Sequence, residues 1–433
     1  MLTRVRLRNF KSFQDVTFDL APFTVIYGGN GVGKSNFGDA LKFLHAIGSG
    51  RSIRDAIEGH YAASFSGSPT EVSAGIRGGG EATTHLEAKS KVFHVEVEGL
   101  TPKGRRLHYR LSVDARQYRI VAESLSAEDH PGAYVYDTHP ESAPLRQSDS
   151  PAIKARYYTN ARGKNPSRSF SPHETILSQF SGRKAEYVYN EARAQEMRDL
   201  LTSIQPLELR PEILRNYSTL GRFNIGEHGE NLAAAAWLLL SYASGYDPTR
   251  ASDAADVETD AYERLQAIKS WLSEMTPRPV TDLLVEEAPT GEVILALKEE
   301  PFSRPLTARS LSDGTLRFTG FAFALLGSAA PRTYVIEELE NGINPSRLAL
   351  MIRMISAATR NGPVQVLTTT HSPTLLDIAG KELLHDMLFV GWDSDNNCSV
   401  VNKVSQLTPQ YLAEDHRLGE LLTEGYLQLA ADR

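Results

Sequence analysis

The sequence is poor in several features that mark whole classes of protein. Its 433 residues include one cysteine, Cys398, so an internal disulfide is excluded and a reducing compartment is favoured. The longest apolar run, Leu232 to Leu240, is far too short to span a bilayer. No signal peptide is expected, because the residues after Met1 lead directly into an alternating strand pattern. These absences predict a cytoplasmic protein with no membrane partner.

The chain also lacks the charge and the repeats of a dedicated nucleic-acid binder or a long scaffold. Its net charge is −7 at pH 7, so any contact with nucleic acid would need a local basic patch. It shows no internal repeat and no heptad run long enough for a coiled-coil arm. A chain of this length exceeds one compact core, and two or three lobes are expected.

What the chain does have is a glycine-rich loop, Gly28 to Ser35, that fits the pattern G-x-x-x-x-G-K-[S/T]. The apolar run Phe23 to Tyr27 predicts a buried strand before it, and the spacing from Asn36 to Ile47 predicts a helix after it. Such a loop presents backbone N–H groups and the positive end of the helix dipole to a phosphate. Lys34 would reach the β- and γ-phosphates, and the hydroxyl of Ser35 would bind Mg²⁺.

A second group of polar residues lies in the last third of the chain. An apolar run ends in Glu337 and Glu338, which suit a ligand for a Mg²⁺-bound water and a general base. Another β-branched run ends at His371, which could hydrogen-bond a γ-phosphate or the attacking water. A Ser-x-Gly turn, Ser312 to Gly314, precedes a helical stretch and could form an anion site or an ordinary helix cap.

Taken together and in this order, these motifs resemble those of ABC-class ATPases of the RecF, SMC and OLD kind. Gly28 to Ser35 matches the Walker A motif, and Glu337-Glu338 matches Walker B with its catalytic glutamate. Leu311 to Thr315 resembles the LSGGQ-type signature, and His371 resembles the switch histidine. The resemblance is closest to the stand-alone predicted ATPases of bacteria that lack a long coiled coil and a TOPRIM domain.

The resemblance implies an α/β fold, a P-loop NTPase with an ABC-type head and with an inserted antiparallel β-lobe and a helical lobe. ATP and Mg²⁺ are the implied cofactors, and ATP would be sandwiched between the heads of a homodimer. The implied catalytic residues are Glu338, His371 and Lys34. The implied metal ligands are Ser35, Glu337 and Gln179. The implied nucleotide contacts are Gly28, Asn30, Gly31, Gly33, Lys34, Ser35, Asn36, Ser312 and Gly314.

The sequence departs from the family pattern at several of these positions. Glu337 stands where relatives usually have Asp, and its longer side chain changes the geometry of a metal-bound water. Leu339 and Asn344 stand where relatives often have Pro and His. Gln179 is the candidate for the glutamine at the start of the helical lobe, and the alternative is a surface glutamine on a helix.

The phosphate loop and the signature are far apart in the sequence, so the head must combine residues 1–50 and 300–433. Residues 51–170 predict an inserted β-rich lobe with a basic loop, and residues 171–299 predict a helical lobe and a return hairpin. Lys154 to Arg168 is locally basic with interleaved aromatic residues, and it could bind DNA or form a solvated loop. Asp393 to Asn397 begins like a Ca²⁺ loop but lacks its glycine, which favours a hairpin turn.

No nuclease, protease or membrane-active segment accompanies these motifs. The resemblance therefore implies a nucleotide-gated ATPase that controls a separately encoded effector protein, a toxin or a nuclease, in antiphage defence. Two alternatives stay open. One is a RecF-like repair ATPase that clamps DNA, and the other is a nucleotide-gated scaffold with negligible turnover.

Overall fold

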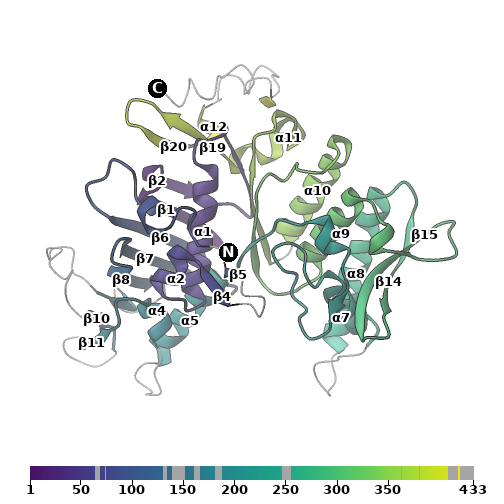
Figure 1. The fold of residues 1–433 in the computed structure, drawn as a ribbon, viewed down its shortest axis with the longest axis horizontal. Coiled ribbons are helices and arrows are strands. Elements are labelled where there is room, and N and C mark those ends of the chain that lie inside the picture. The colour runs from purple at the N-terminus through teal and green to yellow at the C-terminus, as the bar shows by residue number, and fades with distance from the viewer. Residues whose placement is uncertain are drawn as a thin grey trace. The chain divides into compact units, whose positions relative to one another are not determined.

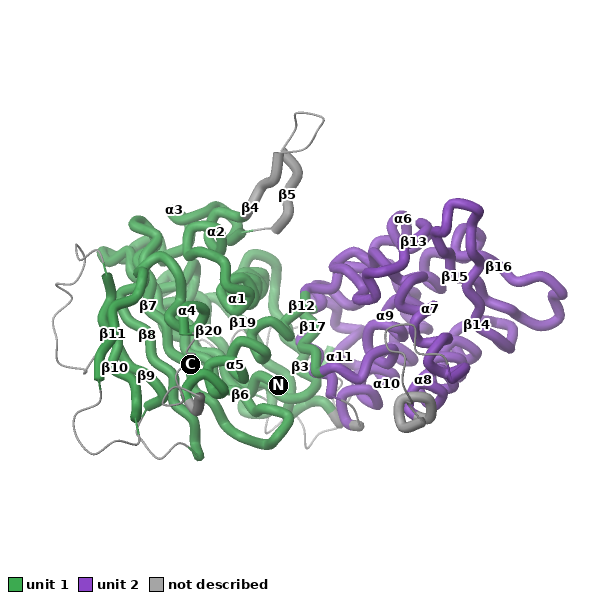
Figure 2. The backbone as a smooth tube through the Cα atoms, turned by 90° about the horizontal axis from the view of Figure 1, so that it is seen from below, with its two compact units in different colours: residues 1–205, 331–335, 383–433 green, residues 206–330, 336–382 purple. Residues whose placement is uncertain are grey.

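The computed structural model describes residues 1–63, 69–73, 75–129, 134–138, 152–159, 166–180, 188–245, 255–361, 363–379, 381–407 and 418–419. They form two compact units (Figure 2). Unit 1 comprises residues 1–205, 331–335 and 383–433, and unit 2 comprises residues 206–330 and 336–382. Residues 171–205 are thus grouped with the glycine-rich loop, and residues 300–330 are grouped with the helical part. Arg162 and Lys164 of the basic segment lie outside the described residues.

An eight-stranded antiparallel sheet dominates unit 1 (Figure 1), with strand order β11-β10-β9-β8-β7-β6-β1-β2. Strand β6 (Val92–Leu100) buries every second residue, because alternate side chains of a strand point to opposite faces. The predicted antiparallel β-lobe is therefore present. The other strands are β1 (Leu2–Phe10), β2 (Phe13–Asp19), β7 (Arg106–Asp114), β8 (Arg119–Ala127), β9 (Tyr136–Asp137), β10 (Ile153–Tyr157) and β11 (Ser167–Phe170).

A second group of strands in unit 1 leads to the glycine-rich loop. Strand β3 (Phe23–Tyr27) pairs in parallel with β19 (Met387–Asp393), and β19 pairs antiparallel with β20 (Cys398–Lys403). The first four residues of β3 are buried, as expected for a strand covered on both faces. Strand β12 (Ile204–Pro206) lies beside β17 (Arg332–Ile336), and the N–H of Thr333 donates to the carbonyl of Ser203 at 2.9 Å.

Aromatic side chains fix helix α1 (Lys34–Gly48), which follows the loop, against the large sheet. Phe43 of α1 and Phe10 of β1 both meet Phe93 of β6 edge-on, with ring centroids 5.4 and 5.5 Å apart. Phe37 of α1 stacks on Phe18 of β2 at 4.0 Å. Because these rings are buried, the start of α1 has a defined position in unit 1. The remaining elements of this region are α2 (Ile53–Glu58), β4 (His60–Ala63), β5 (Pro69–Ser73), α3 (Gly79–Thr83), α4 (Ile176–Gln179), α5 (Val188–Thr202) and α12 (Val404–Leu407).

Unit 2 is mainly helical and contains one small antiparallel sheet. Strands β14 (Val280–Glu287) and β15 (Glu292–Glu299) form the predicted return hairpin, with Gly291 at φ +81° in its turn. Helix α8 (Ala255–Met275) packs against α7 (Leu232–Ala243) and α9 (Asp313–Leu326). No helix in the described ranges is long and apolar enough to cross a membrane. The other elements are α6 (Pro211–Leu214), β13 (Ser218–Thr219), β16 (Leu306–Thr307), α10 (Pro345–Asn361), β18 (Val364–Thr370) and α11 (Pro373–Ala379).

Candidate functional site

The glycine-rich loop of unit 1 joins β3 to α1, as the sequence predicts. A Cβ atom on Gly28 would lie 2.4 Å from the carbonyl oxygen of Val390, and one on Gly33 would lie 2.6 Å from the hydroxyls of Ser12 and Ser399. Gly33 also has φ +108°, a conformation that residues with side chains rarely adopt. Glycine is thus required at both positions for the chain to turn and enter α1.

The start of α1 has the properties of an anion site. No described side chain caps this helix end, and its first turn carries no acidic residue. Lys34 is buried, and its Nζ donates to the carbonyl oxygens of Gly28 and Gly29, both at 2.7 Å. The loop therefore combines helix N–H groups, which attract anions, with an ammonium group held beside them.

Side chains from other segments support the glycine-rich loop through hydrogen bonds. The amide of Asn36 donates to the hydroxyl of Ser12 at 2.7 Å. The hydroxyl of Ser399, on β20, donates to the carbonyl oxygen of Val32 at 2.6 Å. Asn36, which the resemblance implies to be a nucleotide contact, thus supports the loop in this structure.

A charged cluster beside α1 was not found by sequence reasoning. Asp39, whose side chain is 3% exposed, pairs with Lys11 at 2.6 Å and with Arg77 at 3.0 Å. Arg77 also donates to the carbonyl oxygen of Ser35 at 2.6 Å. Asn9, near the end of β1, and Lys11, in the turn between β1 and β2, have positive φ. Each of the three charged residues is in a different segment, so no local motif joins them.

The two residues Glu338 and His371 face each other in unit 2. The Nδ1 of His371, directly after β18, lies 3.4 Å from Oε1 of Glu338. Oε2 of Glu338 accepts a hydrogen bond of 2.6 Å from the amide of Asn341. Glu338 has φ +52°, and its N–H donates to Oγ1 of Thr369 at 3.2 Å. A residue other than glycine in this conformation is rare and is often part of a functional site.

Glu337 and the residues of the predicted signature also lie in unit 2. Glu337 is exposed at the end of β17. Ser312 is the N-cap of α9, and its Oγ accepts from the N–H of Thr315 at 3.2 Å. A Cβ on Gly314 would meet nothing closer than Cε of Met275, at 3.9 Å. The fold of the single chain therefore does not require glycine at position 314.

Gln179 is not brought to the glycine-rich loop. Its Nε2 donates to the carbonyl oxygens of Ser171 and Glu174 at 3.0 and 2.8 Å, and its Oε1 accepts from the N–H of Ser171 at 2.9 Å. The preceding residue lies beside Gly50, just past the C-terminal end of α1. A helix of 15 residues is about 20 Å long. Gln179 thus closes its own turn at the far end of α1.

Gln205 is a second glutamine at the start of the helical lobe, the position for which the sequence suggests Gln179. Unit 2 begins at Pro206, directly after Gln205. Gln205 also lies on β12, which neighbours β17, and the two carboxylates follow β17 in the sequence. Sequence reasoning missed this residue because the pairing of β12 with β17 joins segments that are far apart in the chain.

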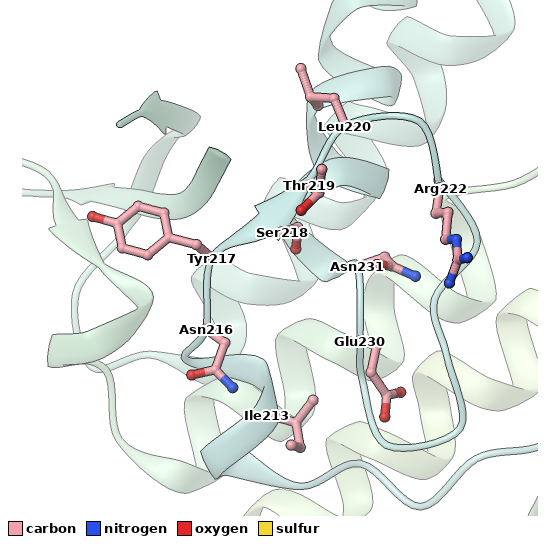
Figure 3. Close-up of a pocket in the computed structure, with 9 residues that line it drawn as sticks. All are labelled: Ile213, Asn216, Tyr217, Ser218, Thr219, Leu220, Arg222, Glu230 and Asn231. Atoms are coloured by element: carbon pink, nitrogen blue, oxygen red, sulfur yellow. The ribbon is translucent and has the colours of Figure 1, made fainter. Parts of the chain in front are cut away.

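Unit 2 also contains a cavity of about 500 Å³ near α6 and the start of α7 (Figure 3). Among the residues that line it, Tyr217 is at the left of the view and Arg222 is at the right (Figure 3). Cζ of Arg309 also lies 4.9 Å from the ring centre of Tyr217, in a cation–π contact. The residues around the cavity are Ile213, Asn216, Tyr217, Ser218, Thr219, Leu220, Arg222, Glu230 and Asn231, none of which the motifs predict.

Comparison with solved structures finds a general likeness to SMC heads, at TM-scores below 0.5. An SMC head bound to the C-terminal winged-helix domain of ScpA is 14% identical, with a TM-score of 0.49, covering 93% of this chain and 96% of that chain. The SMC head domain from Thermotoga maritima is 14% identical, with a TM-score of 0.42, covering 93% and 98%. An SMC head with an extended coiled coil, bound to a ScpA domain and derived from Pyrococcus furiosus, is 15% identical, with a TM-score of 0.46, covering 96% and 98%.

No curated protein matches the sequence. A family model does, and its description is "AAA domain, putative AbiEii toxin, Type IV TA system". It matches residues 23–377, which include the glycine-rich loop, both carboxylates and His371. The chain therefore belongs to this family of AAA domains, and it has the fold of a P-loop NTPase.

Proposed function

We propose that this protein binds ATP with Mg²⁺ and hydrolyses the bond between its β- and γ-phosphates, with Glu338 as the general base. The observation that carries the proposal is the contact between Glu338 and His371 in unit 2. A carboxylate and an imidazole side by side can take and relay the proton of an attacking water. The carboxylate is also partly exposed, so water can reach it.

The residues of the chain are chemically suited to bind a nucleoside triphosphate. The uncapped start of α1 would receive the β-phosphate, and Lys34 would exchange its two loop carbonyls for phosphate oxygens. Ser35 and Glu337 would hold Mg²⁺ or its water, with Gln205 in the role first given to Gln179. Bound Mg²⁺ would neutralise charge on the β- and γ-phosphates.

A homodimer in which ATP lies between two heads is the second part of the proposal. Ser312 is exposed at the N-terminus of α9, and Gly314 has room around it within the chain. A glycine that its own fold does not need is consistent with the close approach of a ligand or a second chain. The phosphate loop of one subunit would then face Ser312 and Gly314 of the other.

Substitution of the base tests the catalytic part. Glu338→Gln should retain ATP binding and lower steady-state turnover by about 10² or more, since general-base catalysis supplies that much. Lys34→Ala should instead weaken ATP binding. The matched control is Glu286→Gln, because Glu286 is an exposed carboxylate on β14 outside the site. Equal turnover by Glu338→Gln and wild type would rule out the assignment and favour the scaffold with negligible turnover.

We further infer that the ATPase controls a separately encoded effector, a toxin or a nuclease, in the cytoplasm and in antiphage defence. The family description, which names a toxin and a toxin–antitoxin system, supports this role. A conformational change can be read by a partner only if that partner binds the two states with different affinity. Purification of the protein with the products of its neighbouring genes, with and without ATP, is the test. Absence of any nucleotide-dependent partner would contradict it.

The DNA-binding alternative has less support from the described residues. Arg156 lies 3.6 Å from Asp137 and 5.4 Å from the ring centre of Tyr134. Arg168 lies 5.3 Å from the ring centre of Phe170. Both guanidinium groups are thus engaged within the chain. Binding to DNA that falls steeply with salt would restore the repair-type hypothesis.

A further inference from the structure

Glu340 is a largely buried carboxylate for which the proposed hydrolysis has no role. It lies in unit 2, in the loop after β17, and its side chain is 13% exposed. We propose that Glu340 is a positioning residue, which holds the ring of His371 in the orientation that catalysis needs. This inference rests on the proposed function, because it assigns Glu340 to the same site.

Three contacts join Glu340 to the end of β18. Its Oε1 accepts a hydrogen bond of 2.7 Å from the hydroxyl of Thr370. The same oxygen accepts from the main-chain N–H of His371 at 3.3 Å, and it lies 3.7 Å from Nδ1 of the His371 ring. One carboxylate oxygen thus contacts the backbone and the side chain of the histidine together.

These contacts decide which nitrogen of His371 is available. Nδ1 lies between Oε1 of Glu338 at 3.4 Å and Oε1 of Glu340 at 3.7 Å. A proton on Nδ1 is favoured there, because both neighbouring groups are carboxylates and their charge attracts it. The partner of one ring nitrogen sets the tautomer and thereby the role of the other. Nε2 is therefore the nitrogen left to face water or a phosphate.

Packing alone does not explain Glu340. Among the described residues, its Oε2 is buried and has no hydrogen-bond partner. A buried carboxylate oxygen without a partner lowers stability. A side chain kept only for the fold would be better replaced by a neutral one, whereas a residue that orients His371 needs its charge. Stability and activity should therefore respond to substitution in opposite directions.

The variant Glu340→Gln tests this. It keeps the shape of the side chain and an acceptor for Thr370, and it removes the charge near Nδ1. We expect kcat to fall about tenfold, KM for ATP to change less than twofold, and the thermal midpoint to stay or rise. Glu340→Asp, which keeps the charge, should recover part of kcat. Glu286→Gln is the control, with no change in kcat.

A double-mutant cycle separates positioning from an independent effect. If Glu340 acts through His371, Glu340→Gln should have no further effect on kcat in a His371→Ala background. Additive losses would overturn the proposal, and so would an unchanged kcat with a lower thermal midpoint. Should Glu340→Gln fail to fold, the same cycle with Glu340→Asp decides.

A spectroscopic measurement does not depend on turnover. In protein labelled with ¹³C and ¹⁵N at histidine, His371 is assigned from the signal missing in His371→Ala. Glu340→Gln should shift its ring signals, whereas Glu286→Gln should not. If the wild type fails to hydrolyse ATP, the proposed function is wrong, and these spectra alone decide whether Glu340 orients His371. Unchanged ring signals would overturn the inference.

Discussion

At the scale of single residues, one buried carboxylate joins several parts of unit 1. Glu123, on β8, is 1% exposed. It accepts hydrogen bonds from the hydroxyls of Tyr109 and Tyr136 at 3.1 and 2.7 Å, and from the N–H groups of Ile176 and Leu177 at 2.7 and 3.0 Å. Burial raises the pKa of Glu123 from its ordinary value of 4.5 to about 7, against the opposite effect of these donors. No local sequence pattern predicts this residue, since its partners come from three segments.

This raised pKa predicts how stability depends on pH. Between pH 4.5 and 7 the folded protein holds a proton on Glu123 that the unfolded chain releases. The stabilisation that Glu123 adds to the free energy of unfolding is therefore fully present below pH 4.5. It is lost as pH rises through about 7, and this loss is up to about 3 kcal/mol. Glu123→Gln lacks this titration. Urea denaturation at several pH values should show the advantage of wild type over the variant shrinking as pH rises, and a constant difference would contradict the prediction.

At the scale of elements, helix α9 is joined to the loop that carries Glu338. Arg317 of α9 donates to the carbonyl oxygen of Asn341 at 2.8 Å. Asn341 in turn donates to Oε2 of Glu338 at 2.6 Å. Gly342 has φ +70°, and a Cβ there would lie 2.9 Å from Cζ of Arg317. The helix that begins with the signature residues is thus two hydrogen bonds away from the proposed base.

Removal of the hydrogen bond between Arg317 and Asn341 should disturb the position of Glu338 and leave the binding of ATP unchanged. Arg317→Ala loses a hydrogen bond from a charged donor, which contributes about 1.5–3 kcal/mol. We expect kcat to fall about tenfold, with ATP affinity unchanged. The control is Arg353→Ala, because Arg353 is an exposed arginine on α10 that pairs with Glu274. Turnover of Arg317→Ala equal to that of the control would show that α9 and Glu338 are not coupled.

Elements were more predictable than the site. The strand before the glycine-rich loop, the helix after it and the hairpin turn at Asp393 to Asn397 follow from local patterns, and all are present. Asp393 accepts hydrogen bonds from the N–H groups of Asp395 and Asn396, which close that turn. By contrast, the environments of Gln205, Asp39 and Glu340 depend on pairings between distant segments. Such pairings leave no periodicity or spacing in the sequence to be read.

At the scale of the whole molecule, the chain passes between the two units at residues 205/206, 330/331, 335/336 and 382/383. The phosphate loop belongs to unit 1, whereas Glu338, His371 and the signature residues belong to unit 2. In the proposed ATP sandwich, the signature residues at a nucleotide come from a second copy of the chain.

The proposed dimer can be tested by substitution of Ser312 and Gly314, because the fold of the single chain does not require glycine at position 314. Gly314→Ala places a Cβ in ordinary contact with Met275 and removes a glycine from the first turn of α9, so the thermal midpoint should stay or rise. Ser312→Arg should leave binding of ATP to the single chain intact. If these residues contact the nucleotide of a partner subunit, both variants should lower turnover about tenfold or more and prevent ATP-dependent dimerisation.

Sedimentation in the Glu338→Gln background, with and without ATP, measures the dimerisation directly. Slow turnover in that background keeps ATP bound, so a closed dimer should accumulate and should disappear on addition of Ser312→Arg. Ser303→Arg is the matched control, since Ser303 is exposed in the loop before β16. A mass that does not respond to ATP in Glu338→Gln would mean either a constitutive oligomer or no sandwich. If Ser312→Arg then kept full turnover, there would be no ATP sandwich, because hydrolysis would need no residue from a second chain.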